Sequence, residues 1–248
     1  MVNASNAVEY VALATIQGAV VALPHPAALE RLGHLRSRVW ALVAPGCILV
    51  GTFGVLALPL LASGLAVLAQ IATPVLAVIA VMAVVHGRQR GLLVVPLALG
   101  AVAAAGHGWP GELAASLLTA LGCLTLGAAF VRLTPARWLY LGVLSMVALD
   151  VLLLALGVGQ PAAALVRDAL GSTIQPAFDH AQLGDFSVDY PDLVLAAVVG
   201  AVIADRAMQQ AAALLVAISA AAYGALFAFA GMLPATVPLA LVLVLVEC

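Results

Sequence analysis

The sequence has few charged residues and no lysine. Charged residues make up 8% of the 248 residues, and all 9 basic side chains are arginine. So few charges cannot cover the water-facing surface of a soluble domain of this length. The net charge of −2 also provides no basic surface for a nucleic acid. The scarcity of charge therefore excludes a soluble globular protein and argues against a nucleic-acid-binding protein.

Several metal-site and nucleophile patterns are absent as well. The cysteines Cys47, Cys123 and Cys248 lie far apart in apolar stretches, so we expect small buried side chains rather than a disulfide or a metal site. No His-Glu-x-x-His motif is present, which excludes the usual zinc site of a membrane metalloprotease. No Gly-x-Ser-x-Gly motif supports a serine nucleophile. We therefore expect neither a metal nor a cofactor.

Long apolar runs dominate what is present. Hydrophobic residues make up 65% of the chain, and the mean hydropathy is +1.21. Because a helix needs about 20 apolar residues to cross a bilayer, we predict an all-α, polytopic transmembrane bundle of about nine spans. Residues 1–248 form a single transmembrane domain, with an N-terminal bundle over 1–137 and helices six to nine over 138–248. The expected spans are 7–23, 40–61, 64–86, 91–106, 112–132, 138–158, 185–204, 209–231 and 233–247.

The arginines predict the orientation of the chain. Eight of them follow the odd-numbered spans one, three, five and seven: Arg31, Arg36, Arg38, Arg88, Arg90, Arg132, Arg137 and Arg206. The opposite connections contain only Arg167. By the positive-inside rule, the arginine-rich side is cytoplasmic. We therefore expect an integral, multi-pass protein of a prokaryotic plasma membrane, with residues 159–184 extracytoplasmic and the C-terminus cytoplasmic.

Two smaller features bear on packing. Residues 162–170 fit a short interfacial helix within the long segment between spans six and seven. Gly46, Gly51 and Gly54 would permit close helix contact in the second span.

Two aspartates stand out against the apolar background. Asp150 lies in LSMVALDVLLLALG, and Asp185 lies in AQLGDFSVDYPDLVLAAVVG. A carboxylate at mid-bilayer costs roughly 2.5–3.5 kcal/mol on insertion scales, so chains that keep one usually use it. Asp150 alone would fit a proton relay, an ion site or a hydrogen bond to Ser145. Asp185 alone would fit a helix cap. The antiparallel course of spans six and seven brings both toward the outer side, where they could form a pair that shares a proton.

Neighbouring acids allow a different interpretation. Asp185, Asp189 and Asp192 are spaced i, i+4 and i+7, and together with Asp179 and His180 they could form a cation site. Pro191 lies among them, so the seventh helix could instead begin near this proline, after an irregular, wet segment over 185–190.

Three segments resemble the presenilin and signal-peptide-peptidase family of intramembrane aspartyl proteases. LGDFSVDYPDLVLAAVVG resembles the GxGD segment of that family's seventh helix. Asp150 followed by VLLLALG resembles the sixth helix, and LPATVPLALVL resembles a degenerate Pro-Ala-Leu motif of the ninth. The three segments occur in the family's order, on the sixth, seventh and ninth predicted spans.

The resemblance implies a function and a site. Asp150 and Asp185 would be the catalytic pair, hydrolysing peptide bonds in transmembrane segments or remnant signal peptides through an activated water. The substrate-binding residues implied are Leu183, Gly184, Pro234, Ala235 and Thr236. The partners would be single-span substrates with a cytoplasmic N-terminus and the lipid bilayer itself. The sequence does not define the oligomeric state.

Three positions depart from the family pattern. The first glycine of GxGD is Gln182, the tyrosine before the first aspartate is Leu149, and the leucine of Pro-Ala-Leu is Thr236. These departures keep two alternatives open. One is a proton-coupled transporter or channel that uses Asp150 and Asp185 as a relay. The other is a non-proteolytic relative that binds membrane helices.

Overall fold

The computed structural model describes residues 4–25, 29–85, 93–106, 108–169, 178, 180–184, 186–203, 208–230, 236, 239 and 241–243. The chain is mostly helical. The helices are α1 (Ala4–Ala22), α2 (Val43–Ala57), α3 (Leu60–Ile79), α4 (Val94–Ala105), α5 (Trp109–Leu133), α6 (Ala136–Ala155), α7 (Gly159–Ala169), α8 (Tyr190–Ile203) and α9 (Gln209–Ala230). Short helical turns η1 (Glu30–Leu35) and η2 (Arg38–Leu42) precede α2, and the π-helical segment η3 (Ala80–Val85) extends α3.

Helix length and composition support a membrane-embedded protein. Within the described residues, four helical segments are long and apolar enough to cross a membrane: Arg38–Ala57, Leu60–Val84, Trp109–Leu133 and Ala136–Ala155. Shorter apolar helices cover Val8–Ala22, Val94–Ala105, Tyr190–Ile203 and Gln209–Ala222. Helices thus occur in the first eight expected spans, whereas most of 233–247 lies outside the described residues. The count of nine spans stays a prediction.

Of the two predicted starts of the seventh helix, the one at Asp185 is wrong and the one near Pro191 is confirmed. A β-hairpin of β1 (His180–Leu183) and β2 (Phe186–Asp189) comes first, and α8 begins only at Tyr190. The strands are antiparallel, with Leu183 opposite Phe186 and His180 opposite Asp189. The all-α prediction therefore omits one small sheet. Pro191 fits the first turn of α8, because its missing N–H costs nothing there.

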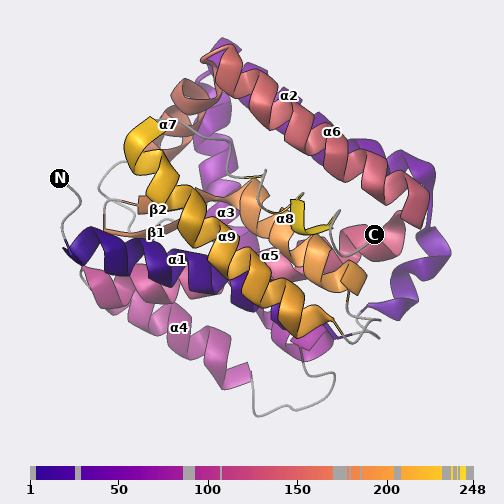
Figure 1. Cartoon of the computed structure of the whole chain (residues 1–248), viewed down its shortest axis with the longest axis horizontal. Coiled ribbons are helices and arrows are strands. Elements are labelled where there is room, and N and C mark those ends of the chain that lie inside the picture. Colours follow the sequence, from indigo (N-terminus) through magenta and orange to yellow (C-terminus); the bar gives the residue numbers. More distant parts are fainter. Residues whose placement is uncertain are drawn as a thin grey trace.

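Helix α5 is the central element of the bundle. It is the most buried of the four long helices and packs against α3, α4, α8 and β1. In Figure 1 it crosses the middle of the molecule, while α2 and α6 lie side by side along one edge. One face of α5 carries Glu112, Ser116, Thr119, Cys123 and Gly127, spaced four, three, four and four residues apart. This spacing keeps all five on one side of a helix.

That face of α5 holds the hairpin in place. Ser116 Oγ donates to the carbonyl of Gln182 at 2.8 Å and accepts from its N–H at 2.9 Å. Thr119 Oγ1 and Thr73 Oγ1 both approach the carbonyl oxygen of Phe178, at 3.5 and 3.3 Å. Non-helical backbone at membrane depth is tolerated only when protein satisfies its polar groups. The hydroxyl groups of α3 and α5 supply those partners.

The polar face continues into the contact with α8. Cys123 Sγ lies 3.8 Å from the carbonyl oxygen of Tyr190. At 1.5 Å per residue, Cys123 lies about 21 Å along α5 from Trp109, so α8 starts just past the middle of that helix. Below this point Gly127 packs directly on Ala197, leaving no room for a Cβ atom. Helix α8 is therefore shorter than the expected span 185–204, because the hairpin occupies the beginning of that span.

Ends of several helices lie together at one end of the bundle. His25 N–H donates to the carbonyl of Val84 at 2.8 Å, and Ser37 N–H donates to that of Leu133 at 2.8 Å. Gln209 Nε2 donates to the carbonyl of Pro24 at 2.9 Å. These contacts link residues close to the ends of the first, third, fifth and seventh expected spans. The orientation that the arginines predict stays a prediction.

Candidate functional site

Asp150 lies deep within the apolar helix α6. It is 14 residues after Ala136, about 21 Å along a helix of about 30 Å. Its Oδ2 atom accepts a hydrogen bond of 2.6 Å from Oγ1 of Thr236, a residue that is only 3% exposed. The contact joins two of the three segments that carry the family resemblance, across 86 residues of sequence.

Asp192 is a second carboxyl group near Asp150. It lies in the first turn of α8, is 8% exposed and interacts electrostatically with Asp150 and Asp189. Its side chain also accepts the backbone N–H of Asp189. A residue at the third helical position that bonds the N–H just before the helix is half of a capping box. The sequence pattern indicated Asp192 only as a possible cation ligand, although the Tyr-Pro-Asp triplet could have indicated this cap.

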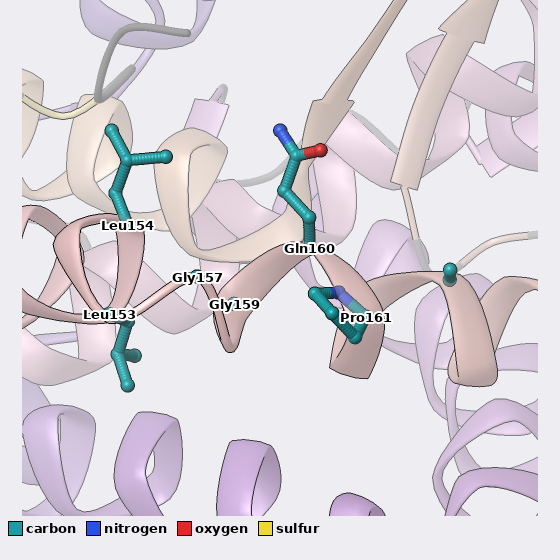
Figure 2. Close-up of a pocket in the computed structure, with 7 residues that line it drawn as sticks. Leu153, Leu154, Gly157, Gly159, Gln160 and Pro161 are labelled. Carbon is teal, nitrogen blue, oxygen red and sulfur yellow. The ribbon is translucent and has the colours of Figure 1, made fainter.

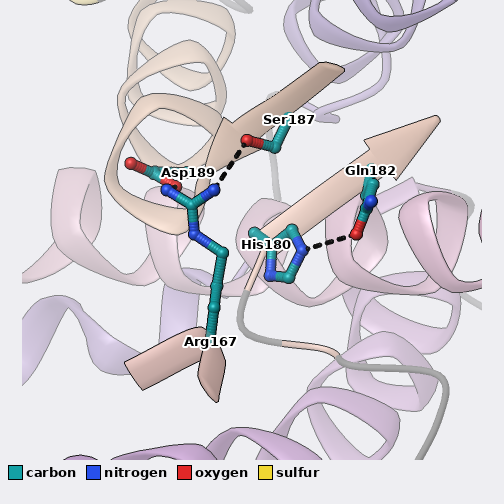
Figure 3. Close-up of polar contacts among 5 residues, drawn as sticks. All are labelled: Arg167, His180, Gln182, Ser187 and Asp189. Carbon is teal, nitrogen blue, oxygen red and sulfur yellow. Dashed lines mark hydrogen bonds and ion pairs between the residues drawn. The ribbon is translucent and has the colours of Figure 1, made fainter. Parts of the chain in front are cut away.

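Asp189 connects the hairpin to α7. Its Oδ1 lies 3.9 Å from Nη2 of Arg167, whose Nη1 donates to Ser187 Oγ at 3.4 Å (Figure 3). The two charged side chains are 38% and 48% exposed, so the pair contributes little to stability. The predicted short helix near residues 162–170 corresponds to α7, and its Arg167 orients this helix against β2.

Gln182, which stands at the position of the first glycine of GxGD, makes side-chain contacts to other residues of the hairpin. Its Oε1 lies 3.0 Å from Nε2 of buried His180, as Figure 3 shows, and its Nε2 donates to the carbonyl of Gly184 at 3.0 Å. His180 and Gln182 point to the same face because they are two residues apart in a strand. This departure from the family pattern therefore has a local structural role.

Gly184 occupies a position that only glycine fits. It lies at the hairpin turn with φ +57°, and a Cβ atom there would overlap the carboxylate of Glu9. Its N–H donates to Oε2 of Glu112 at 2.8 Å, which fixes the turn at the start of α5. The preceding Leu183 is fully buried in the hydrophobic core.

Three predicted site residues lie outside the described part of the chain. They are Asp185, Pro234 and Ala235. The pairing of Asp150 with Asp185 therefore stays a prediction. Of the remaining site residues, Thr236 contacts Asp150, whereas Gly184 contacts Glu112 at the far end of the hairpin from Asp192.

The predicted cation site has no counterpart in the part of the chain that the structure describes. No group of three or more His, Cys, Asp or Glu residues there is placed to hold a metal ion. His180 contacts Gln182, and Asp189 pairs with Arg167. Asp179 and Asp185 lie outside the described residues.

A cavity of about 410 Å³ lies beside the corner between α6 and α7, one helical turn beyond Asp150. Figure 2 shows Leu154 and Gln160 extending from the two helices in the same direction. Its volume falls within the range of ordinary ligand pockets and its lining is largely apolar. The lining residues are Leu153, Leu154, Gly157, Gly159, Gln160, Pro161 and Ala164.

Comparison with known proteins adds no relative. No protein-family model, curated protein or solved structure matches the chain. What points to a function is therefore the resemblance of the three segments together with the geometry described above.

Proposed function

We propose that the chain is an intramembrane aspartyl endopeptidase in which Asp150 and Asp185 activate water for peptide-bond hydrolysis. The observation that carries this proposal is the hydrogen bond from Thr236 to Asp150. It brings the segment that resembles the Pro-Ala-Leu motif onto the aspartate that the resemblance implies as catalytic. If the resemblance to the Pro-Ala-Leu motif were accidental, Thr236 would not be expected to contact that carboxylate.

The chemistry needs two carboxyl groups and no metal. One ionised aspartate takes a proton from water while the water oxygen attacks the peptide carbonyl carbon. The other, protonated, donates to the carbonyl oxygen and so stabilises the tetrahedral intermediate. The C–N bond then breaks: the departing amine takes a proton from the first carboxyl, and one hydroxyl of the intermediate returns its proton to the second carboxyl as the carbonyl re-forms. Thr236 would hold Asp150 in the orientation needed for this exchange.

The substrates proposed are single-span membrane proteins or remnant signal peptides. The apolar cavity at the α6–α7 corner supports this choice, since it opens one turn from Asp150 and suits aliphatic side chains.

Asp192 raises a specific question about the second carboxyl group. It is the carboxyl group that the described residues bring within electrostatic range of Asp150, whereas Asp185 is the one that the resemblance implies. Separate variants of the two distinguish these assignments.

The test is cleavage of a fluorogenic single-span substrate by the purified protein in proteoliposomes. Asp150→Asn and Asp185→Asn should each abolish cleavage while the protein stays folded. Asp168→Asn, the same change on the exposed surface of α7, is the matched control and should cleave normally. Cleavage at the wild-type rate by the double variant Asp150→Asn/Asp185→Asn would overturn the proposal. Loss with Asp192→Asn but not Asp185→Asn would assign the second catalytic role to Asp192.

A second candidate is a proton-coupled transporter. It is favoured by the proximity of three proton-carrying groups, Thr236, Asp150 and Asp192. It predicts solute flux driven by a pH gradient in the same liposomes, lost in Asp150→Asn, with no peptide products. A non-proteolytic helix-binding relative predicts neither products nor binding of a transition-state-mimicking aspartyl protease inhibitor.

A further inference from the structure

A second cavity lies at the end of the bundle where ends of several helices lie together. Its volume is about 430 Å³, and it lies between η1, the α5–α6 corner and the last turn of α8. It is on the opposite side of the bundle from the hairpin turn. The lining residues are Glu30, Gly33, Arg36, Val131, Arg132, Thr134, Ala136, Leu139, Tyr140, Ala201 and Val202.

Thr134 lies beside this cavity and has an unsatisfied hydrogen-bonding group. The residue is 0% exposed, and its Oγ1 atom makes no hydrogen bond within the described structure. Buried hydroxyls are normally paired, so this one indicates a missing partner, which it would reach when its side chain turns toward the cavity. Because a hydroxyl is both donor and acceptor, the partner can be an oxygen anion.

The charges on the wall favour an anion. Arg36 and Arg132 contribute two guanidinium groups and Glu30 one carboxylate, which leaves one net positive charge. Arg36 uses its Nε to donate to the carbonyl of Thr134 at 3.3 Å, so its guanidinium is held beside the orphan hydroxyl. A guanidinium has five N–H donors, and the fork of terminal N–H groups matches phosphate geometry.

Aromatic residues mark this end of the bundle as interfacial. Trp40 donates through Nε1 to the carbonyl of Leu35, and Arg137 stacks over the Trp138 ring at 5.8 Å. Tyr140 lies on the cavity wall itself. Tryptophan and tyrosine gather at the level of lipid headgroups.

We infer that this cavity binds the phosphate group of a singly charged phospholipid at the arginine-rich surface. Arg36 and Arg132 contact the phosphate oxygens, and the Thr134 hydroxyl donates to one of them. The apolar wall formed by Val131, Leu139 and Val202 faces the start of an acyl chain. The single negative charge of a phosphodiester matches the net charge of the wall. This site is independent of the protease proposal.

The experiment is a native mass spectrometry titration of the full chain in detergent with phosphatidylglycerol. Diacylglycerol with the same acyl chains is the control lipid, because it lacks only the phosphoglycerol group. We expect retention of phosphatidylglycerol and not of diacylglycerol. Thr134→Val, which keeps the side-chain shape, and Arg132→Gln should each weaken binding about tenfold, the effect of one lost charge-assisted hydrogen bond. Glu30→Gln should strengthen it severalfold, because it removes the opposing charge.

Arg137→Gln is the matched control, since Arg137 lies at the same end but not on the cavity wall. It should bind like the wild type. Equal binding of both lipids, or wild-type affinity in Thr134→Val and Arg132→Gln together, would overturn the inference. Inorganic phosphate at millimolar concentration distinguishes the source of the phosphate. Failure to displace the lipid supports a headgroup site, and full displacement assigns the site to a soluble anion.

Discussion

The bond between Thr236 and Asp150 provides the sharpest test of the proposed site. Thr236→Val removes the donor and keeps the shape of a side chain that is 3% exposed, so packing should change little. A hydrogen bond to a charged group contributes about 1.5–3 kcal/mol. If that energy orients Asp150 for reaction, kcat should fall by a factor of roughly 10 to 150.

The assay is cleavage of the single-span substrate in proteoliposomes, with kcat and KM measured separately. KM should change little, because Thr236 contacts the carboxylate rather than the cavity lining. Thr236→Ser restores the hydroxyl and should recover most of the activity.

Thr125→Val is the matched control for the stability cost. Thr125 is also a buried threonine, and its Oγ1 donates to the carbonyl of Leu76 at 2.8 Å, a contact between α5 and α3. Both valine variants should lower the thermal unfolding midpoint, but only Thr236→Val should lower kcat. A wild-type kcat in Thr236→Val, or equal loss in the valine and serine variants, would refute the assigned role of the hydroxyl.

Two further variants test the packing that positions the site. Asp192→Asn should leave stability nearly unchanged, because asparagine can still accept the Asp189 N–H; Asp192→Leu leaves that N–H unpaired and should lower stability. Thermal unfolding of the detergent-solubilised protein measures both, and a fall of equal size in the two variants would contradict the capping role. Gly127→Ala should lower stability by about 1–3 kcal/mol, because its Cβ would overlap Ala197 across the α5–α8 contact. The control is Gly100→Ala on α4, where no atom lies within 4 Å of the added Cβ, and it should be neutral or slightly stabilising. Similar unfolding midpoints for the two alanine variants would exclude a tight α5–α8 contact.

The glycines show that a local sequence pattern does not identify which helix packs against each of them. Gly46 and Gly51, which the sequence offered as a packing face, have open space around them, whereas Gly127 and Gly200 lie against α8 and α1 neighbours. Each glycine permits close approach, but the neighbour that uses it comes from a distant part of the chain. The expectation of close helix packing therefore holds for Gly54, where an added Cβ would lie 3.2 Å from the Leu61 side chain, and is wrong for Gly46 and Gly51.

The amino-acid sequence by itself determined that the chain is a bundle of apolar helices. A helix satisfies its own backbone hydrogen bonds, so hydropathy alone indicates where most of them form. It also determined that the arginines follow alternate helices and that Asp150 lies far inside α6. These properties depend on residues close together in the chain.

Only the tertiary structure decided that a hairpin occupies the beginning of the seventh span. The hairpin over residues 180–189 cannot satisfy its backbone alone, and its partners are Glu112 and Ser116 on α5. The reason for polar residues on this face of α5 becomes clear only when the hairpin is seen to pack against it. The same holds for Asp150, whose hydrogen-bond donor Thr236 is 86 residues away. Long-range polar pairs depend on how helices pack, and packing is a property of the whole chain.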